Sequence, residues 1–348
     1  DMLVHKSTYL DVPKNWLGEQ FFLEAKYLKK LHINQYNHEY LGEVTGTGGE
    51  IFDNLEVGHI ETVNTLKNLG HVEFEKGDLR NSVDVEKLFS KYKIEGVIHF
   101  AAHALVAESV KNPDKYYQNN VIGTINLLHS MIKHDVKRIV FSSTCATYGE
   151  PKYVPIDENH PQNPINPYGT SKLIVEKILD DYDKAYGLKS IKLRYFNVVG
   201  ADSLCRVGEW HENETHLVPN IIKSALQEEK ELKIFGDDYD TKDGTCVRDY
   251  INVEDLVEAH RLAYEYLLKE NKSDVFNLGT QNGSSVKEIF EMCQNVLNKK
   301  INYKIESKRL GDPAMLYADN SKIHQILNWR PEKTLEHSIK TAYEWEIK

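Results

Sequence analysis

Long apolar runs are missing from this sequence of 348 residues. No stretch approaches the roughly 20 apolar residues that a membrane-spanning helix needs. The first residues, DMLVHKSTYLDVPKN, also lack the long apolar centre of a secretory signal, so we expect a cytosolic protein. Hydrophobic residues nevertheless make up 41% of the chain, a share typical of a globular protein with a packed core.

Clustered cysteines and an excess of basic charge are absent as well. The four cysteines lie far apart and form no CxxC pair, which argues against a disulfide framework and against a zinc cluster. The formal net charge of -10, with acidic and basic residues interspersed, argues against nucleic-acid binding, which usually needs a concentrated basic face. We therefore expect a small-molecule partner and neither a nucleic-acid nor a membrane partner.

The sequence does contain an alternating pattern of predicted strands and helices. From residue 95, short apolar runs alternate with longer amphipathic stretches, which predicts a doubly wound parallel sheet covered by helices. Residues 201–246 are polar and interrupt this rhythm, which indicates a smaller domain beside the sheet. The predicted fold class is therefore α/β, Rossmann-like, with a smaller carboxyl-terminal substrate domain. The predicted strands are 96–102, 138–143, 190–196 and 274–280, and the predicted helices are 115–136, 168–186 and 217–227.

The strongest chemical signal is a tyrosine and a lysine four residues apart, Tyr168 and Lys172, where a helix is predicted to begin after Pro167. Residues at this spacing lie on one helix face. A phenol, with a pKa of about 10, is a poor base at neutral pH, but a nearby ammonium and a cationic nicotinamide would favour the phenolate. Tyr168 would then accept a proton.

A second signal lies upstream, where Ser142-Ser143-Thr144 ends a predicted strand. Open α/β sheets present groups to ligands at the carboxyl ends of their strands, so Thr144 is placed to hydrogen-bond the same hydroxyl as Tyr168. Taken alone, each pattern is common by chance, and YxxxK is more often an exposed helix start. Their order along the chain, followed by a strand that ends in Arg194-Tyr195-Phe196-Asn197, is much harder to obtain by coincidence.

In this order of motifs the chain resembles the extended short-chain dehydrogenase/reductase family, and within it the UDP-glucose 4-epimerases, also called UDP-galactose 4-epimerases. The resemblance runs from about Phe52 to the carboxyl terminus. Its most specific segment is IFGDDYDTKDGTCVRDYINVEDL at 234–256. Four further segments match in the same order: HFAAHALVAES at 99–109, YYQNNVIGT at 116–124, FSSTCATYGEP at 141–151 and RLGDPAMLYAD at 309–319.

The resemblance implies a catalytic trio. Tyr168 would be the base, Lys172 would tune it and hold the nicotinamide ribose, and Thr144 would orient the sugar hydroxyl. Hydride from C4 would pass to NAD and leave a 4-keto sugar, which would swing about its diphosphate linkage and present its other face. UDP-glucose and UDP-galactose would then interconvert reversibly while NAD emerges unchanged.

The resemblance also implies binding residues. Arg248 offers a planar fork of donors suited to a diphosphate, and Leu316 is expected to gate the sugar pocket. Its intermediate size favours UDP-glucose and UDP-galactose without excluding the N-acetylated pair. The expected NAD contacts are Asp53, Asn54, Asp78, Leu79, Phe100, Ala101, Ala102, Asn119, Tyr168, Lys172 and Phe196. The expected UDP-sugar contacts are Thr144, Asn197, Leu217, Phe235, Arg248, Arg309 and Asp312.

The amino-terminal part departs from the family pattern. A Rossmann site needs a strand, a Gly-rich turn and a helix whose amino end faces the pyrophosphate. Here the turn Thr45-Gly46-Thr47-Gly48-Gly49 runs almost directly into Ile51-Phe52-Asp53-Asn54-Leu55, so the third glycine, the helix and most of the second strand are missing. MLV at 2–4 and the stretch 18–28 are candidates for a displaced strand and helix.

These considerations predict an interleaved domain organisation. Residues 1–44 form an atypical amino-terminal segment, 45–200 and 246–280 form the NAD-binding domain, and 201–245 and 281–348 form the UDP-sugar-binding domain. Family members commonly dimerise through the two helices that begin near Tyr116 and Tyr168, which implies a homodimer.

Two alternatives to the epimerase remain to be weighed. A 4,6-dehydratase needs an acidic pair after SST, and Cys145-Ala146 stand there, which argues against it. A non-catalytic nucleotide-sugar-binding relative with an impaired NAD site is supported only by the unusual amino terminus. Cys145 is expected to be a small buried packing residue, and His103, His211 and His216 are not spaced as a metal site, so no metal is expected.

Overall fold

The computed structural model describes residues 49–69, 72–211, 214–227, 231–309 and 312–348. The chain divides into two compact units, Asp1–Phe52 with His59–Glu75 and Asp53–Gly58 with Lys76–Lys348. The candidate strand at 2–4, the candidate helix at 18–28 and the glycine-rich turn at 45–48 lie outside the described residues.

A pair of strands and one helix make up the described part of the first unit. Strand β1 (Gly49–Asp53) pairs with β2 (Val72–Lys76), and helix α3 (Ile60–Leu69) lies between them in sequence and buries Val63. The prediction that most of a strand is missing before Asn54 is therefore wrong. Five residues are enough for a strand when a partner strand takes up their backbone hydrogen bonds.

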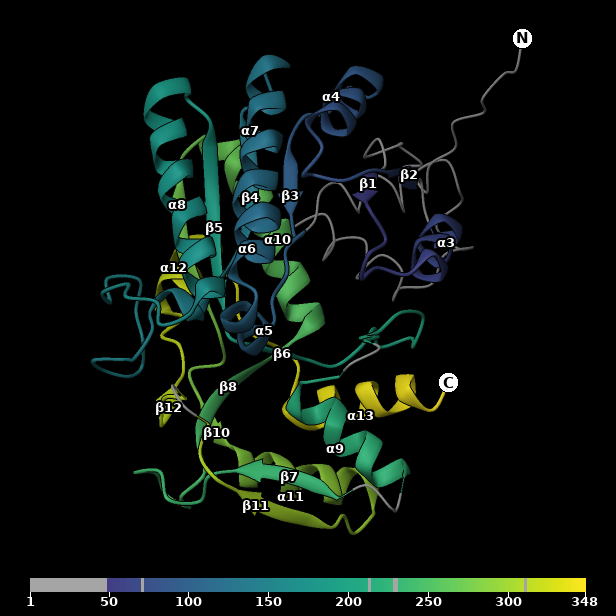
Figure 1. Ribbon diagram of the computed structural model, residues 1–348, viewed down its shortest axis with the longest axis vertical. Coiled ribbons are helices and arrows are strands. Elements are labelled where there is room, and N and C mark those ends of the chain that lie inside the picture. Colours follow the sequence, from purple (N-terminus) through teal and green to yellow (C-terminus); the bar gives the residue numbers. More distant parts are fainter. Residues whose placement is uncertain (1–48, 70–71, 212–213, 228–230, 310–311) are drawn as a thin grey trace, which may run out of the picture. The chain divides into compact units, whose positions relative to one another are not determined.

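A four-stranded parallel sheet lies at the centre of the second unit (Figure 1). Its order is β3 (Val97–His99), β4 (Arg138–Thr144), β5 (Lys189–Tyr195) and β9 (Asp274–Leu278). Thr144 pairs with Tyr195, so the carboxyl ends of β4 and β5 reach the same edge of the sheet. The predicted α/β class and its parallel sheet are confirmed.

Strand β3 is shorter and less buried than the sequence predicts. The run 96–102 was expected to be a buried strand, but only its middle pairs with β4, and the side chain of Ile98 is 42% exposed. Phe100, just beyond the strand, is 52% exposed. Within the described residues, β3 is the edge of this sheet, so one side of it has no strand to cover it.

Two long helices cover opposite faces of the sheet, α8 (Pro167–Tyr186) and α10 (Val253–Glu270). Successive side chains of a strand point to opposite faces. Accordingly, the hydroxyl of Ser142 shares a hydrogen bond with His260 of α10 at 2.8 Å, and that of Ser143 donates to Glu176 of α8 at 2.5 Å.

The remaining helices around the sheet are shorter. The predicted helix at 115–136 is a run of three consecutive segments, because a π-helical stretch, η3, interrupts it. The three segments are α6 (Pro113–Tyr116), η3 (Tyr117–Ile122) and α7 (Gly123–Lys133). The other short helical elements are α4 (Ser82–Lys91), α5 (Val106–Lys111), the 3-10 turn η4 (Cys145–Thr147) and α12 (Ser321–Leu327).

A smaller set of elements has its own hydrophobic core. Residues from α9, α11, α13 and β7 bury one cluster, which includes Ile221, Phe290 and Ile339. A separate cluster joins the sheet to α10 and includes Val140 and Leu193. The elements of the smaller set are β6 (Asn197–Val199), α9 (Leu217–Leu226), β7 (Leu232–Phe235), β8 (Val247–Asn252), β10 (Gly283–Ser285), α11 (Val286–Leu297), β11 (Tyr303–Glu306), β12 (Met315–Leu316) and α13 (Leu335–Glu346).

Two separate cores fit the predicted division into a cofactor domain and a sugar domain, which stays a prediction.

Strands β10, β8, β12 and β6 form one sheet of the smaller set, and β7 pairs in parallel with β11. None of the helices in the described ranges has the length and the apolar character that crossing a bilayer requires.

A buried ion pair ties β5 to α8. The guanidinium of Arg194 lies 2.6 Å from the carboxylate of Glu176, and the two side chains are only 6% and 3% exposed. Gln162 and Ser143 also donate to this carboxylate. Removing one member of such a pair leaves an uncompensated charge in a region of low dielectric constant.

We expect Arg194→Met to lower the free energy of unfolding by about 3 kcal/mol or more, because Glu176 would stay buried without its cation. The matched control is Arg206→Met, which removes an ion pair with Asp202 in which the arginine is 42% exposed. Its loss should be much smaller, because exposed ion pairs contribute little to stability. Urea denaturation followed by circular dichroism measures both, and equal losses would contradict the argument.

Candidate active site

The carboxyl end of β4 and the amino end of α8 meet at the residues expected to carry the chemistry. Thr144 is the last residue of β4. Asn166 caps α8 by accepting a hydrogen bond from the amide of Gly169 at 2.8 Å, so Tyr168 lies in the first helical turn. There its phenol is near enough to the side chain of Thr144 for that side chain to lower the pKa of the phenol. Both side chains are buried.

Lys172 lies one turn further along α8 and is 3% exposed. Its Nζ donates to the carbonyl oxygen of Ser142 at 2.8 Å and lies 4.8 Å from the centre of the Phe141 ring. An ammonium has three N–H donors. Within the described residues the structure gives this nitrogen one hydrogen-bond acceptor, so donors remain for the hydroxyls of a ligand.

Burial dominates the ionisation of both groups. It lowers the pKa of Lys172 to about 7 despite the nearby Glu176, and it raises the pKa of Tyr168 above its ordinary value, as do Tyr195, Cys145 and Tyr116. The side chain of Thr144 acts in the opposite direction on the pKa of Tyr168. The lysine alone therefore does not produce a phenolate, and a further positive charge beside the phenol is required.

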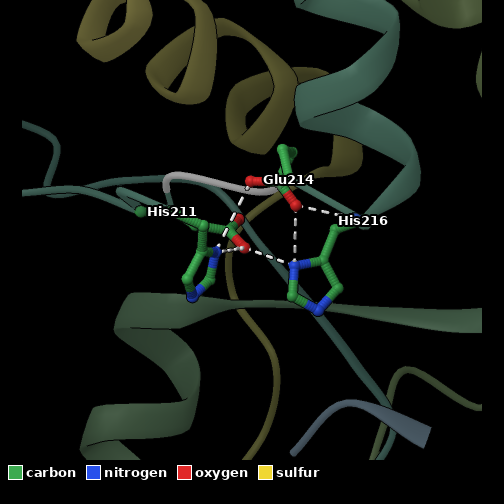
Figure 2. Close-up of side chains that lie close together, drawn as sticks. His211, Glu214 and His216 are labelled. Atoms are coloured by element: carbon green, nitrogen blue, oxygen red, sulfur yellow. Dashed lines mark hydrogen bonds and ion pairs between the residues drawn. The ribbon is translucent and has the colours of Figure 1, made fainter. Parts of the chain in front are cut away.

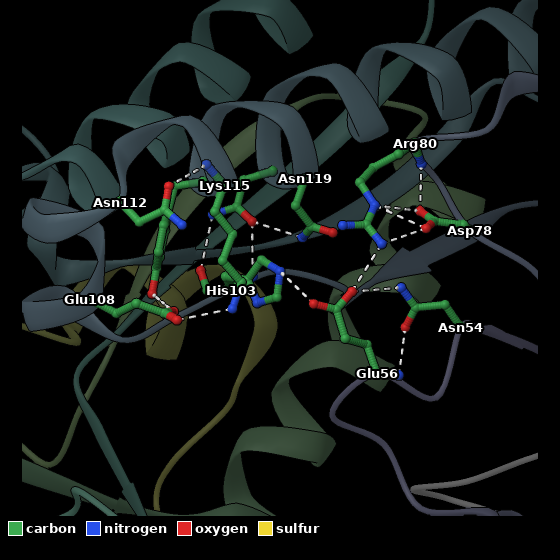
Figure 3. Close-up of polar contacts among 11 residues, drawn as sticks. Asn54, Glu56, Asp78, Arg80, His103, Glu108, Asn112, Lys115 and Asn119 are labelled. Atoms are coloured by element: carbon green, nitrogen blue, oxygen red, sulfur yellow. Dashed lines mark hydrogen bonds and ion pairs between the residues drawn. The ribbon is translucent and has the colours of Figure 1, made fainter. Parts of the chain in front are cut away.

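A polar cluster gathers at the expected adenosine end of the cofactor site (Figure 3). Arg80 Nη2 lies 2.9 Å from the carboxylate of Glu56 and 2.6 Å from that of Asp78, and Asn54 donates to Glu56 at 3.4 Å. The hydrogen bond from Arg80 lowers the pKa of Asp78. The sequence singled out Asn54 and Asp78 but missed Glu56 and Arg80. The position of Arg80, two residues after Asp78, is the signal that would have found it.

Other expected cofactor residues lie on the same part of the second unit. The carboxylate of Asp53 accepts a hydrogen bond from the amide of Leu55 at 2.5 Å. Leu79 packs so closely on α7 that a Cβ added at Gly123 would lie 3.1 Å from its own Cβ. Figure 3 shows Asn119 between His103 and Arg80, and its amide donates to Asn120.

The described residues at the adenosine and nicotinamide ends of the expected site fit a dinucleotide. Phe100 presents a largely exposed ring that lies 4.6 Å from the ring of His260, and Ala101 and Ala102 follow as small, half-buried residues. A flat aromatic ligand would cover such a surface. Lys172 would have donors left for a ribose at the nicotinamide end. The glycine-rich turn for the pyrophosphate lies outside the described residues.

The histidines have different surroundings. His103 is buried, its pKa is lowered by burial, and its Nε2 has no hydrogen-bond partner among the described residues; Glu56 lies 3.8 Å away. His211 and His216 lie close together with Glu209 and Glu214, in a group whose ligand atoms could hold a metal ion, and the expectation that no metal binds stays a prediction. The loop before α9 brings them together, which sequence spacing alone does not reveal.

Four residues expected to hold the nucleotide sugar form a connected group. Arg248 on β8 is nearly buried, and its guanidinium lies 3.4 Å from the carboxylate of Asp312 and donates to the carbonyl of Pro313 at 2.8 Å. The guanidinium of Arg309 lies 3.9 Å from the centre of the Phe235 ring. The amide of Asp312 donates to the carbonyl of Arg309, which links the two pairs.

Leu316 and Cys145 connect this group to the catalytic end. Leu316 pairs with Arg248 across β12 and β8, and its side chain packs on the buried cluster that contains Cys145 and Phe196. Burial raises the pKa of Cys145 to about 12, so its thiol is inert and its predicted packing role is confirmed. Of the other expected sugar contacts, Asn197 begins β6 and Leu217 begins α9.

Comparison with known proteins gives consistent matches. The family model described as "GDP-mannose 4,6 dehydratase" matches residues 42–342. A UDP-glucose 4-epimerase of Halalkalibacterium halodurans is 48% identical over 85% of this chain and 87% of its own. The structure of UDP-glucose 4-epimerase from Brucella ovis in complex with NAD matches with a TM-score of 0.81 and 41% identity, over 91% of this chain and 93% of its own. A UDP-glucose 4-epimerase from Bifidobacterium longum in complex with NAD+ and UDP has the same TM-score and 38% identity, over 86% and 90%.

The lowered pKa of Lys172 predicts a specific pH dependence of stability for the chain stripped of NAD. Between about pH 7 and its ordinary pKa of 10.5, the unfolded state holds a proton on Lys172 that the folded state has lost. The free energy of unfolding therefore rises with pH in this window, and this contribution disappears below pH 7, where both states are protonated.

In Lys172→Met this contribution is absent. Between pH 7 and pH 9, the difference in free energy of unfolding between native and variant chains should shift by about 2 kcal/mol in favour of the native chain. Urea denaturation at the two pH values measures it. Parallel pH profiles for the two chains would show that the amine stays charged in the folded state.

Proposed function

The chain belongs to the UDP-glucose 4-epimerase family, within the family described by the GDP-mannose 4,6 dehydratase model, and we propose that it interconverts UDP-glucose and UDP-galactose at C4 with bound NAD. The observation that carries this proposal is the convergence of Thr144, Tyr168 and Lys172 in one buried site at the carboxyl end of β4.

Tyr168 is the proposed base. Its phenolate would accept the proton of the C4 hydroxyl as the C4 carbonyl forms, and the resulting phenol would return the proton when the carbonyl is reduced. Burial keeps the free phenol protonated, so the base forms only when a positive charge lies beside it. When bound, NAD supplies that charge, accepts the C4 hydride and gives it back.

Thr144 and Lys172 support this proton transfer. The side chain of Thr144 lies near the phenol and lowers its pKa, and it is proposed to orient the sugar hydroxyl beside it. Lys172, held by the carbonyl of Ser142, is proposed to donate to the nicotinamide ribose. Contact with ribose oxygens would favour its ammonium form and add positive potential near the phenol.

The remaining proposed cofactor contacts run from the adenosine ribose to the nicotinamide. Asp53 and Asn54 are proposed to contact the adenosine ribose, and Asp78 and Leu79 the adenine. Asn119 and Phe196 are proposed to contact the part of the dinucleotide nearer the nicotinamide. Phe100, Ala101 and Ala102 would line the dinucleotide between them.

The nucleotide sugar is proposed to lie between Arg248 and the catalytic trio. Arg248, with Asn197, would hold the diphosphate, Phe235 would lie by the uracil ring, and Arg309 would help to hold the uridine ribose and phosphate. Asp312 would accept from the uridine ribose, and Leu217 would close the apolar side. An anchored diphosphate lets the 4-keto sugar rotate and present its other face, so the returned hydride inverts C4.

The two alternatives are weaker. Dehydration needs an acidic group after Thr144, and the side chain there is the thiol of Cys145, whose pKa is raised to about 12. A non-catalytic relative would have no use for a buried tyrosine, threonine and lysine in contact. The homodimer through the helices near Tyr116 and Tyr168 and the cytosolic location stay predictions.

We expect Tyr168→Phe to lower kcat for UDP-galactose conversion by roughly a hundredfold to ten-thousandfold, the range associated with a positioned general base. The matched control, Tyr186→Phe, lies at the other end of α8 with a side chain that is 52% exposed, and should keep native activity. NAD released on denaturation checks that the variant still holds its cofactor. Near-native turnover by Tyr168→Phe would remove it as the base.

If the native chain neither releases NAD nor converts UDP-galactose when NAD is added, the non-catalytic alternative holds instead.

Leu316 is expected to set substrate breadth. In Leu316→Tyr the added phenol should crowd an N-acetyl group, so kcat/KM for the N-acetylated pair should fall at least about tenfold relative to that for UDP-glucose and UDP-galactose, a loss of about 1.4 kcal/mol. Met315→Tyr is the control, because the neighbouring side chain points to the other face of β12. An unchanged ratio in Leu316→Tyr would exclude this residue as the gate.

A further inference from the structure

Two histidines and two glutamates converge in the loop between β6 and α9, away from the catalytic trio in sequence and in role. Glu209 and His211 come from the middle of the loop, and Glu214 and His216 come from its end, directly before α9 (Figure 2). Each offers one ligand atom, and all four atoms lie within 4.8 Å of one another.

The ligand atoms face one another at short range. Nδ1 of His211 lies 3.2 Å from the carboxylate of Glu209 and 3.5 Å from that of Glu214. Nδ1 of His216 lies 2.5 Å and 3.1 Å from the same two groups. Figure 2 shows both imidazoles turned toward the shared carboxylates.

Neighbouring elements hold this arrangement in place. The carboxylate of Glu214 accepts hydrogen bonds from the amides of Thr215 and His216, both at 2.7 Å. The carbonyl of Glu209 accepts from the indole of Trp345 on α13 at 2.8 Å. The amide of Asn220, one turn into α9, donates to the carbonyl of His216. The loop is thereby fixed to two helices before any ion is considered.

The four side chains differ in exposure in a way that suits ion entry. Glu214 is 5% exposed and Glu209 25%, whereas His211 is 36% and His216 50% exposed. The carboxylates thus form the inner wall of the group, and the imidazoles form a side that solvent reaches. Two carboxylates facing each other in one small space need positive charge between them, which either protons on the imidazoles or a bound ion supplies.

We propose that Glu209, His211, Glu214 and His216 bind one divalent transition-metal ion, with zinc the best match. Bonds of about 2.0–2.1 Å arranged tetrahedrally separate neighbouring ligand atoms by roughly 3.4 Å. Three of the histidine-to-carboxylate distances, 3.1, 3.2 and 3.5 Å, lie near this value, and the fourth, 2.5 Å between His216 and Glu209, would have to lengthen when an ion binds. Two imidazoles disfavour calcium and magnesium, which take oxygen ligands.

The ion would stabilise the loop and would take no part in the epimerisation reaction. It would join the middle of the loop to the residue that caps α9, immediately before Leu217, and so fix the start of the helix that carries a proposed sugar contact. The inference does not depend on the epimerase proposal, because none of the four ligands belongs to the proposed catalytic or cofactor residues.

The competing state has protons in place of the ion. Hydrogen bonds to Glu209 and Glu214 raise the pKa of His211 to about 9 and that of His216 to about 10, so two imidazolium groups would also neutralise the two carboxylates. Metal binding must displace these protons. The experiment therefore has to detect the ion itself.

The test uses the full chain after dialysis against EDTA, titrated with CoCl2 and separately with ZnCl2. We expect about one equivalent of Co2+ to give the visible absorption of a tetrahedral ion, without the ultraviolet bands of a cobalt–thiolate bond. We expect ZnCl2 to displace that ion and to raise the thermal midpoint. His211→Gln and His216→Gln should each raise the dissociation constant at least about tenfold.

His129→Gln is the matched control, because His129 is an exposed histidine on α7, outside the cluster. It accounts for metal held by other surface histidines. Glu209→Gln, which keeps the shape of the side chain and removes its charge, serves if a histidine variant fails to fold by circular dichroism.

The proposal is overturned if the native chain shows no saturable binding, or if the three cluster variants bind the ion as tightly as His129→Gln. Either result would identify the cluster as a set of ion pairs only.

Discussion

The burial of β4 between two helices is the constraint on which the rest of the site depends. Consecutive residues of one strand cannot point the same way, so Ser142 bonds α10, Ser143 bonds the buried carboxylate on α8, and Thr144 closes the strand at the edge of the sheet. The same geometry brings the carbonyl of Ser142 to the amine of Lys172. Positions of the catalytic groups thus follow from how the strand is held.

Burial also decides the chemistry that these groups perform on their own. A phenol and an amine removed from water both shift toward their neutral forms, and burial moves the pKa of Tyr168 up and that of Lys172 down accordingly. A site that stays neutral until a cation arrives couples proton abstraction to the presence of the oxidant. A buried residue with this behaviour remains unreactive toward sugar hydroxyls when the cofactor is missing.

Periodicity and order recovered the sheet and the positions of Thr144, Tyr168 and Lys172 on β4 and α8, because these depend on contacts that are local or that repeat along the chain. The strand at 138–143 and the helix after Pro167 were predicted within a residue or two. The sequence-based predictions failed where contacts between residues distant in sequence determine the structure. Ile98 is exposed because β3 lies at the described edge of the sheet, and Gly49–Asp53 forms a strand because β2 supports it. Likewise, a turn of the chain brings His211 to His216, and no periodic pattern encodes that turn.

Leu316 connects the residues proposed to bind the nucleotide sugar with the apolar cluster beside the end of β4. Leu316 is bonded through the backbone to the strand of Arg248 on one side and packs on the cluster of Cys145 and Phe196 on the other. The distance between the proposed diphosphate anchor and the end of β4 is therefore set by packed apolar side chains, which transmit small shifts because interiors are dense. A sugar that must rotate between two reactions needs room at one point and fixed ends at two others. A half-buried leucine between a fixed guanidinium and a fixed strand provides that combination, whereas a polar residue there would compete for the hydroxyls of the rotating sugar.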